Sequence, residues 1–175
     1  MKNETLEIIY TRRSVRSYTG EAVPRETLMK ILRAGMAAPS ARNIQPWAFI
    51  VVTDRGKLDS LCAKLPYAKM LDKAGAAIVV CGVPEKDTVY GGKYWVEDCS
   101  AATENILLAC HALGLGAVWT AAHPNEDRAA TVREILNVPE TVVPLNVIPI
   151  GVPKDKGHVI EKFREENIHW ERWQG

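Results

Sequence analysis

Two short polar segments carry the residues best suited to hold an anionic, planar ligand. The segment RRSVRSY at 12–18 places three guanidinium groups and two serine hydroxyls within seven residues. Guanidinium groups bind phosphate oxygens through paired hydrogen bonds, and hydroxyls add further donors. The segment PSARNIQPW at 39–47 contains Asn43 and Gln45, whose amides both donate and accept hydrogen bonds. The first segment predicts a phosphate site, and the second predicts a loop that contacts the polar edge of a heterocyclic ring.

Two further segments are weaker candidates for ligand binding. In GLGAVWTAA at 114–122, small residues near the end of a strand let a ligand approach the backbone closely. In EKFR at 161–164, a cation near the C-terminus could return to a phosphate. All four segments also have ordinary explanations: a solvated basic surface, a rigid helix-to-strand connection, glycines that stop a helix, and a charged arm. Taken one at a time, they leave both interpretations open.

Other features of the sequence argue against several classes of protein. There is no GxGxxG after a strand and no P-loop pattern. The histidines lack metal-ligand spacing and no two cysteines form a CxxC pair, so we expect no metal site and reduced thiols. A net charge of +1 gives no indication of a nucleic-acid or membrane partner. No signal peptide or membrane-spanning stretch is evident, which predicts a cytoplasmic protein.

Alternating strands and helices must position these segments, within the single domain that 175 residues support. Hydrophobic spacing, prolines and capping residues predict helices at about 5–13, 24–38, 54–62, 97–113 and 125–136. Strands are predicted at 47–53, 76–82, 117–121 and 142–150. The apolar run AAIVVCG indicates a fully buried strand, whereas Pro144 and Pro149 predict that the last strand is irregular or lies at an edge. The pattern favours an α/β or α+β fold with one central sheet.

The C-terminal segment 153–175 differs in composition from the rest of the chain. It is polar and charged, yet it contains Phe163, Trp170 and Trp173. Large aromatic side chains gain stability when they are buried. We therefore expect this segment to be an arm that packs on another surface, such as a second subunit.

Together, the first two segments resemble those of the nitroreductase family, which opens with Arg-Arg-Ser-x-Arg-x-Tyr/Phe, followed by a helix and a Pro-Ser-x-x-Asn-x-Gln-Pro-Trp loop. Here RRSVRSY and PSARNIQPW occur in the same order and at the same distance, and the resemblance continues through YAKMLDKAGAAIVV, GLGAVWT and NVIPIGVP. It implies one nitroreductase-like domain over residues 1–175, with an α+β fold and a mostly antiparallel central sheet flanked by helices. It also implies a homodimer that exchanges the C-terminal arms (153–175) and holds FMN at two interface sites.

The resemblance assigns candidate FMN-binding residues position by position. The phosphate is implied to contact Arg12 and Ser14, with Arg13 adjacent. Arg16 is implied to face the N1–C2=O edge of the flavin, where a fixed cation stabilises the charge left by reduction, and Lys69 is a second cation near that edge. The loop lent by the other subunit matches Pro39, Ser40, Asn43 and Gln45. The segment near N5 matches Thr120, Ala121 and Ala122, and the tail is implied to close on the phosphate through Lys162 or Arg164.

The function implied by the resemblance is hydride transfer from NADH or NADPH, through flavin N5, to a small-molecule acceptor such as a nitroaromatic or a quinone. The expected kinetics are ping-pong, with no dedicated side-chain acid or base. Three alternatives stay open. They are another flavin reaction of the same family, such as ene reduction or dehalogenation, a protein that binds or stores FMN without turnover, and a structural domain with no cofactor.

Overall fold

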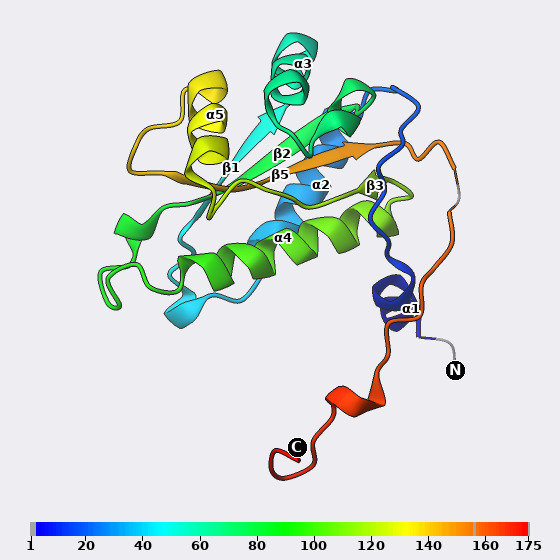
Figure 1. Ribbon diagram of the computed structural model, residues 1–175, viewed down its shortest axis with the longest axis vertical. Helices are drawn as coiled ribbons and strands as arrows, with labels where there is room; N and C mark the ends of the chain where they lie inside the picture. The colour runs from blue at the N-terminus through cyan, green and yellow to red at the C-terminus, as the bar shows by residue number, and fades with distance from the viewer. Residues whose placement is uncertain (1–2, 156, 175) are drawn as a thin grey trace.

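The computed structural model describes residues 3–155 and 157–174 and contains a five-stranded sheet with helices on both faces (Figure 1). The strand order is β1-β2-β5-β3, with β4 also paired to β5, and all these pairs are antiparallel. This confirms the predicted antiparallel sheet flanked by helices. The strands are β1 (Trp47–Val52), β2 (Ala76–Gly82), β3 (Gly116–Ala117), β4 (Thr120–Ala121) and β5 (Val143–Gly151).

Five α-helices were expected, and each begins close to its predicted start. Asp54 caps α3 by accepting a hydrogen bond from the backbone of Lys57, and Asn125 caps α5 in the same way through Arg128. Gly114, with a φ of 74°, follows the end of α4 in the left-handed conformation that glycine adopts easily. The helices are α1 (Glu4–Thr11), α2 (Arg25–Met36), α3 (Arg55–Lys64), α4 (Trp95–Ala112) and α5 (Glu126–Leu136), with 3-10 turns η1 (Ala41–Asn43), η2 (Lys69–Asp72), η3 (Pro84–Lys86) and η4 (Glu165–Asn167).

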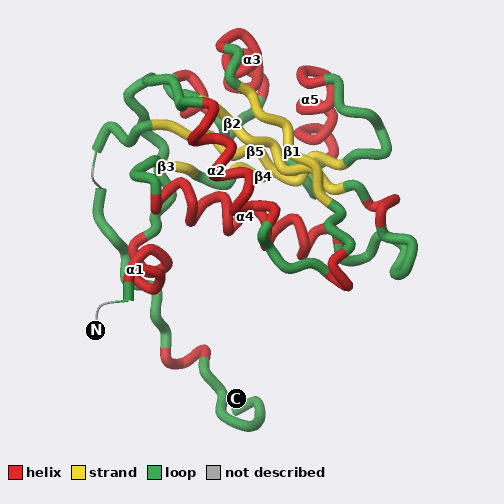
Figure 2. The backbone as a smooth tube through the Cα atoms, turned by 180° about the vertical axis from the view of Figure 1, so that it is seen from behind, coloured by secondary structure: helices red, strands yellow, loops and turns green. Residues whose placement is uncertain are grey.

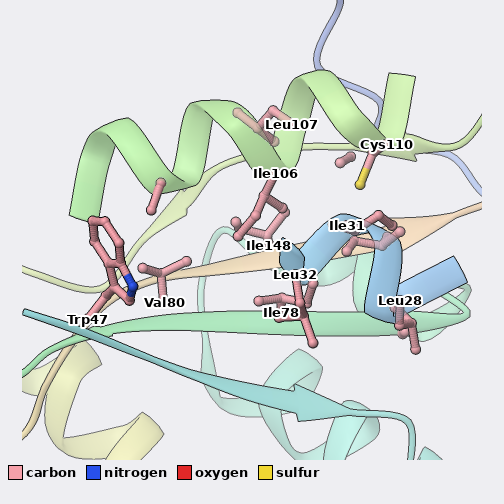
Figure 3. Close-up of a cluster of buried hydrophobic side chains, with 14 of the residues drawn as sticks. Leu28, Ile31, Leu32, Trp47, Ile78, Val80, Ile106, Leu107, Cys110 and Ile148 are labelled. Carbon is pink, nitrogen blue, oxygen red and sulfur yellow. The ribbon is translucent and has the colours of Figure 1, made fainter. Parts of the chain in front are cut away.

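The two faces of the sheet carry separate hydrophobic cores. Helices α2 and α4 cover one face, and α3 and α5 cover the other (Figures 1 and 2). On the first face, Ile78 and Val80 of β2 pack with side chains such as Ile31 and Ile106 (Figure 3). On the second face, Val79 of β2 packs in the cluster that includes side chains of α3 and α5. Successive residues of a strand point to opposite faces, so β2 is buried along its whole length, as its apolar run predicted.

The last strand was predicted to be irregular or to lie at an edge. The structure confirms the irregularity, because the pairing of β5 with β2 shifts register, but β5 lies in the middle of the sheet and not at an edge. Its prolines fall where the hydrogen-bond ladders are already interrupted. Pro144 lies at a bulge of β5, where Asn146 and Pro144 pair with Val80 and Cys81 of β2 and Leu145 is the extra residue. Pro149 lies between the positions of β5 that pair with β3 and with β4. A central strand can therefore contain prolines when it is bulged or when its neighbours are short.

The C-terminal segment leaves β5, passes α1 and extends away from the body of the molecule (Figure 1). Apart from the short turn η4, residues 157–174 form no helix or strand. Phe163 is 64% exposed, Trp170 71% and Trp173 80%, so one copy of the chain does not bury these aromatic side chains. No helix in the described part of the chain has the length and apolar character needed to cross a membrane.

Candidate functional site

The basic segment 12–18 lies where α1 ends and runs beside β3. Ser14 forms a parallel bridge with Ala117, and the backbone N–H of Val15 donates to the carbonyl of Ala117 at 3.0 Å. Arg12 forms an ion pair with Glu104 of α4, its Nε lying 3.0 Å from Oε1. The structure thus joins the first predicted segment to the glycine-rich third segment, although the two are a hundred residues apart in the chain.

Arg13 is directed at the start of the C-terminal arm. Its Nη2 donates to the carbonyl oxygen of Asp155 at 2.6 Å and lies 3.4 Å from a carboxylate oxygen of the same residue. Arg13 also lines a pocket of about 440 Å³ with His111 and Lys154. Arg13 therefore connects the predicted phosphate segment to the arm.

Tyr18 anchors this segment, and Arg16 remains free beside it. The Tyr18 hydroxyl donates to the carbonyls of Val15 at 2.7 Å and Pro149 at 3.1 Å. Burial is the main cause that raises the pKa of Tyr18 above its ordinary value, so this phenol stays protonated. Arg16 is exposed and forms no ion pair with any of the described residues. Its guanidinium group is therefore available to an anionic ligand.

His111 was not among the predicted site residues. Its Nε2 lies 2.9 Å from the hydroxyl of Thr11, so it connects the last turn of α4 to the end of α1. Burial, and then the positive charges of Arg12 and Arg13, lower the pKa of His111. Both causes disfavour the protonated form of this imidazole. The sequence offered no signal for it, since a lone histidine in a helix has no characteristic spacing.

The loop 39–46 has an unusual backbone. Three of its residues other than glycine have positive φ values: Arg42 at 48°, Asn43 at 57° and Gln45 at 55°. Such conformations cost free energy and often mark functional sites. Ser40 stabilises them from within, because its carbonyl accepts from the backbone of Asn43 and its hydroxyl oxygen accepts from the backbone of Gln45. The side chains of Pro39, Asn43 and Gln45 are exposed.

The structure places this loop and the basic segment at opposite ends of α4 (Figure 1). Ala41 contacts Asp98 in the first turn of α4, whereas Thr11 contacts His111 in the last turn. Thirteen residues of helix separate Asp98 from His111, which corresponds to about 20 Å. One copy of the chain therefore does not bring the two most informative segments onto the same ligand.

Residues 120–122 lie on the other side of β5 from β2. Thr120 is buried and its hydroxyl donates to the carbonyl of Val147 at 2.6 Å, whereas Ala121 is exposed. Thr120, Ala121 and Ala122 line a small pocket with the segment 65–68, which leads into η2. Tyr67 and Arg128 line the same pocket, with the guanidinium carbon of Arg128 4.7 Å from the centre of the Tyr67 ring. Arg128 could not be singled out from the sequence, where it follows a helix cap like many surface residues.

The remaining predicted cations have contacts that differ from one another. The Lys69 ammonium group donates to the carbonyls of Cys62 and Ala63 at the end of α3, so it stabilises the C-terminus of that helix. Lys162 lies in a groove of about 610 Å³ between α1 and the arm. Arg164 is exposed and donates to the carbonyl of Phe163. Lys162 lines this groove together with Thr11, at the end of α1 where the basic segment begins.

Comparison with known proteins identifies the class to which this fold and these segments belong. The family described as "Nitroreductase family" matches residues 9–74 and 58–152. A candidate NADH dehydrogenase/NAD(P)H nitroreductase of Archaeoglobus fulgidus is 47% identical over 173 residues, covering 97% of this chain and 99% of the relative.

Solved structures agree with this match. The crystal structure of a candidate NADH dehydrogenase/NAD(P)H nitroreductase from Bacteroides thetaiotaomicron has 48% identity and a TM-score of 0.93, covering 99% of this chain and 100% of that one. An FMN-dependent nitroreductase from Clostridium difficile has 31% identity and a TM-score of 0.86, covering 96% and 99%. The chain belongs to the nitroreductase family and is an enzyme of the nitroreductase type.

Proposed function

We propose that this protein is an FMN-dependent oxidoreductase that takes hydride from NADH or NADPH and passes it to a small-molecule acceptor such as a nitroaromatic or a quinone. The observation that carries the proposal is the pairing of Ser14 with Ala117 of β3, close in the chain to Arg16, which is exposed and has no ion pair among the described residues. Family membership supplies the context. When bound, FMN supplies the hydride chemistry, in two half-reactions that share one site.

The residues around β3 and β4 fit a bound FMN. A phosphate requires positive charge and hydrogen-bond donors. Arg12 and Arg13 supply both, Ser14 adds a neutral hydroxyl, and Lys162 or Arg164 would close from the arm. Glu104 and Asp155 contact the first two of these cations. The phosphate must therefore compete with these carboxylates, which weakens binding but also favours a doubly charged anion over a singly charged one.

The flavin ring would lie along the backbone near Thr120, Ala121 and Ala122, of which Ala121 is exposed. Arg16 would stabilise negative charge at the N1–C2=O edge, because a cation fixed beside developing charge lowers its free energy. Lys69 would act near the same edge only after its ammonium group gives up its hydrogen bonds to the carbonyls of Cys62 and Ala63. We therefore assign the larger electrostatic role to Arg16.

A homodimer is part of the proposal. The loop 39–46 lies about 20 Å along α4 from the basic segment of its own chain, so a site that uses both must combine two copies. Pro39, Ser40, Asn43 and Gln45 would then reach the flavin held by the partner. The arm, with Trp170 and Trp173 exposed, would bury these aromatics on the second copy. The reduced buried thiols and the absence of a long apolar helix among the described residues support a cytoplasmic location.

The first test is the visible spectrum of the purified protein under anaerobic conditions, before and after NADH or NADPH is added. We expect a yellow dimer that either nucleotide bleaches, and parallel double-reciprocal plots with an acceptor. A yellow protein that is not bleached would favour FMN storage. Bleaching without reduction of nitroaromatics or quinones would favour another reaction of the family. A colourless protein that rejects FMN would contradict the proposal.

A further inference from the structure

The loop 39–46 is held to the rest of the protein by a carboxylate that the sequence motifs do not include. The backbone N–H of Ala41 donates to Oδ1 of Asp98 at 2.9 Å. Asp98 lies in the first turn of α4 and is only 7% exposed. The loop lies beside this end of the helix, and α1 lies beside the other end (Figure 1).

The geometry points to Asp98 as the positioning residue of this loop. We propose that Asp98 fixes the place of this loop on the protein, with its left-handed residues Arg42, Asn43 and Gln45, and thereby presents the Asn43 and Gln45 amides to FMN. Asp98 does not itself contact the ligand in this proposal. The inference deepens the proposed function, on which its part about FMN rests.

The other contacts of the loop show why this one matters. The bonds from Ser40 to Asn43 and Gln45, and from Ala41 to Ile44, join loop residues to each other. They preserve the shape of the turn but do not set its place on the protein. Beyond residue 45, Pro46 accepts the backbone N–H of Val83 at 2.7 Å, which fixes the exit of the loop. Among the hydrogen bonds of the described residues, the one from Ala41 to Asp98 ties the entrance of the loop to another element.

The position of Asp98 in α4 suits this role. Partial positive charge at the N-terminus of a helix stabilises a carboxylate, so burial of Asp98 is tolerated without a cationic partner. A hydrogen bond from a backbone N–H to a carboxylate is stronger than one between neutral groups. A strained loop persists only when contacts with the surrounding structure hold it in place. Asp98 supplies that constraint from a rigid helix, which is more precise than support from another loop.

Two substitutions separate this role from a general effect on folding. Asp98→Ala removes the acceptor, whereas Asp98→Asn keeps an oxygen that can accept from Ala41. Asp54→Ala is the matched control, since Asp54 also accepts a single backbone N–H, from Lys57, but does so at the start of α3. Arg42 is exposed in the loop and provides a site for trypsin.

The first readout needs no cofactor. The full-length chain is digested briefly with trypsin without added FMN, and cleavage after Arg42 is quantified by mass spectrometry. We expect Asp98→Ala to increase the rate of this cleavage about tenfold relative to cleavage elsewhere. Asp98→Asn should stay within about threefold of the parent protein, and Asp54→Ala should not change it. These factors correspond to the loss of one charge-assisted hydrogen bond.

The second readout is the Kd for FMN, measured by titration of the cofactor-depleted protein. Asp98→Ala should raise the Kd about tenfold or more, and Asp98→Asn and Asp54→Ala should leave it nearly unchanged. Unchanged trypsin cleavage in Asp98→Ala would overturn the inference. An equal increase of cleavage and of the Kd in Asp98→Ala and Asp98→Asn would overturn it as well. If cleavage follows the expected order but the parent protein does not bind FMN, the proposed function fails while the positioning of the loop by Asp98 stands.

Discussion

Thr103 and Asn146 form a buried polar pair between α4 and β5, and removing one partner gives a sharp prediction. The Asn146 amide nitrogen donates to the Thr103 hydroxyl at 2.9 Å, and that hydroxyl donates to the carbonyl of Cys99 at 2.8 Å. Both residues are fully buried. The other amide atom of Asn146, Oδ1, has no partner in the structure. Thr103→Val would therefore leave both polar atoms of the Asn146 amide unpaired.

The magnitude follows from the shape of the two side chains. Valine matches threonine in size, so the substitution creates no cavity and the loss is electrostatic. A buried donor left unsatisfied costs about 1–3 kcal/mol. For a protein of this length that lowers the melting temperature by about 2–12 °C. Asn146→Leu should cost less, because it also removes the unpaired Oδ1 and leaves the bond from Thr103 to Cys99 intact.

Thr131→Val is a close control, because the Thr131 hydroxyl also donates to the carbonyl four residues earlier in a helix, but at the surface. Urea unfolding with a fixed protein concentration, with and without excess FMN, gives the free energies. We expect Thr103→Val to be destabilised by at least about 1 kcal/mol more than Thr131→Val, and the Thr103→Val/Asn146→Leu double variant to recover part of the loss. Equal effects at the two threonines would refute the view that the Asn146 amide depends on Thr103.

Three further predictions concern the charged residues near α1. Arg16→Gln should lower the two-electron midpoint potential of bound FMN by about 30–60 mV, the equivalent of one hydrogen bond to charge, as measured by equilibration with a reference dye. Glu104→Gln frees Arg12 from its ion pair, whose partners are partly exposed, and should tighten FMN binding by about two- to fivefold in a fluorescence titration. The pKa of His111 is lower in the folded state than its ordinary value of 6.5. Its contribution to the free energy of unfolding is therefore complete above pH 6.5 and is lost as the pH falls below that value, because the unfolded chain then binds a proton more readily. His111→Gln should therefore flatten the decline of unfolding free energy between pH 7 and pH 5, and an unchanged slope would contradict this.

The sequence was most informative where local rules decide the structure. Asp54 and Asn125 predicted the starts of α3 and α5, because an N-cap depends on only a few neighbouring residues. The apolar run of β2 predicted a strand buried on both faces, since the pattern is independent of which elements cover it. The misplacement of β5 has the opposite origin. Whether Pro144 and Pro149 are tolerated in a central strand depends on a bulge of β5 opposite β2 and on the shortness of β3 and β4, which follow from how the strands pair and not from the local sequence.

In the candidate site too, the sequence predicted local features but not contacts between distant segments. The motifs identified the segments 12–18 and 39–47, but their spacing does not reveal that α4 holds them apart. Asp98 and His111 could not be found either, because their roles depend on contacts with segments 57 and 100 residues away. Ser40 was expected to face FMN, and the structure also gives it a role inside its own loop.

Arg13 is proposed to contact both the C-terminal arm and the cofactor. It holds Asp155 at the start of the arm, and it is also one of the residues proposed to bind the phosphate. When one group serves two binding events, thermodynamic linkage makes their coupling reciprocal: the factor by which FMN changes the affinity of the arm for its partner equals the factor by which arm docking changes the affinity for FMN. Under the proposed arrangement, dilution that separates the copies also releases cofactor, and a shortage of flavin weakens the assembly. Quaternary state and flavin supply would then vary together.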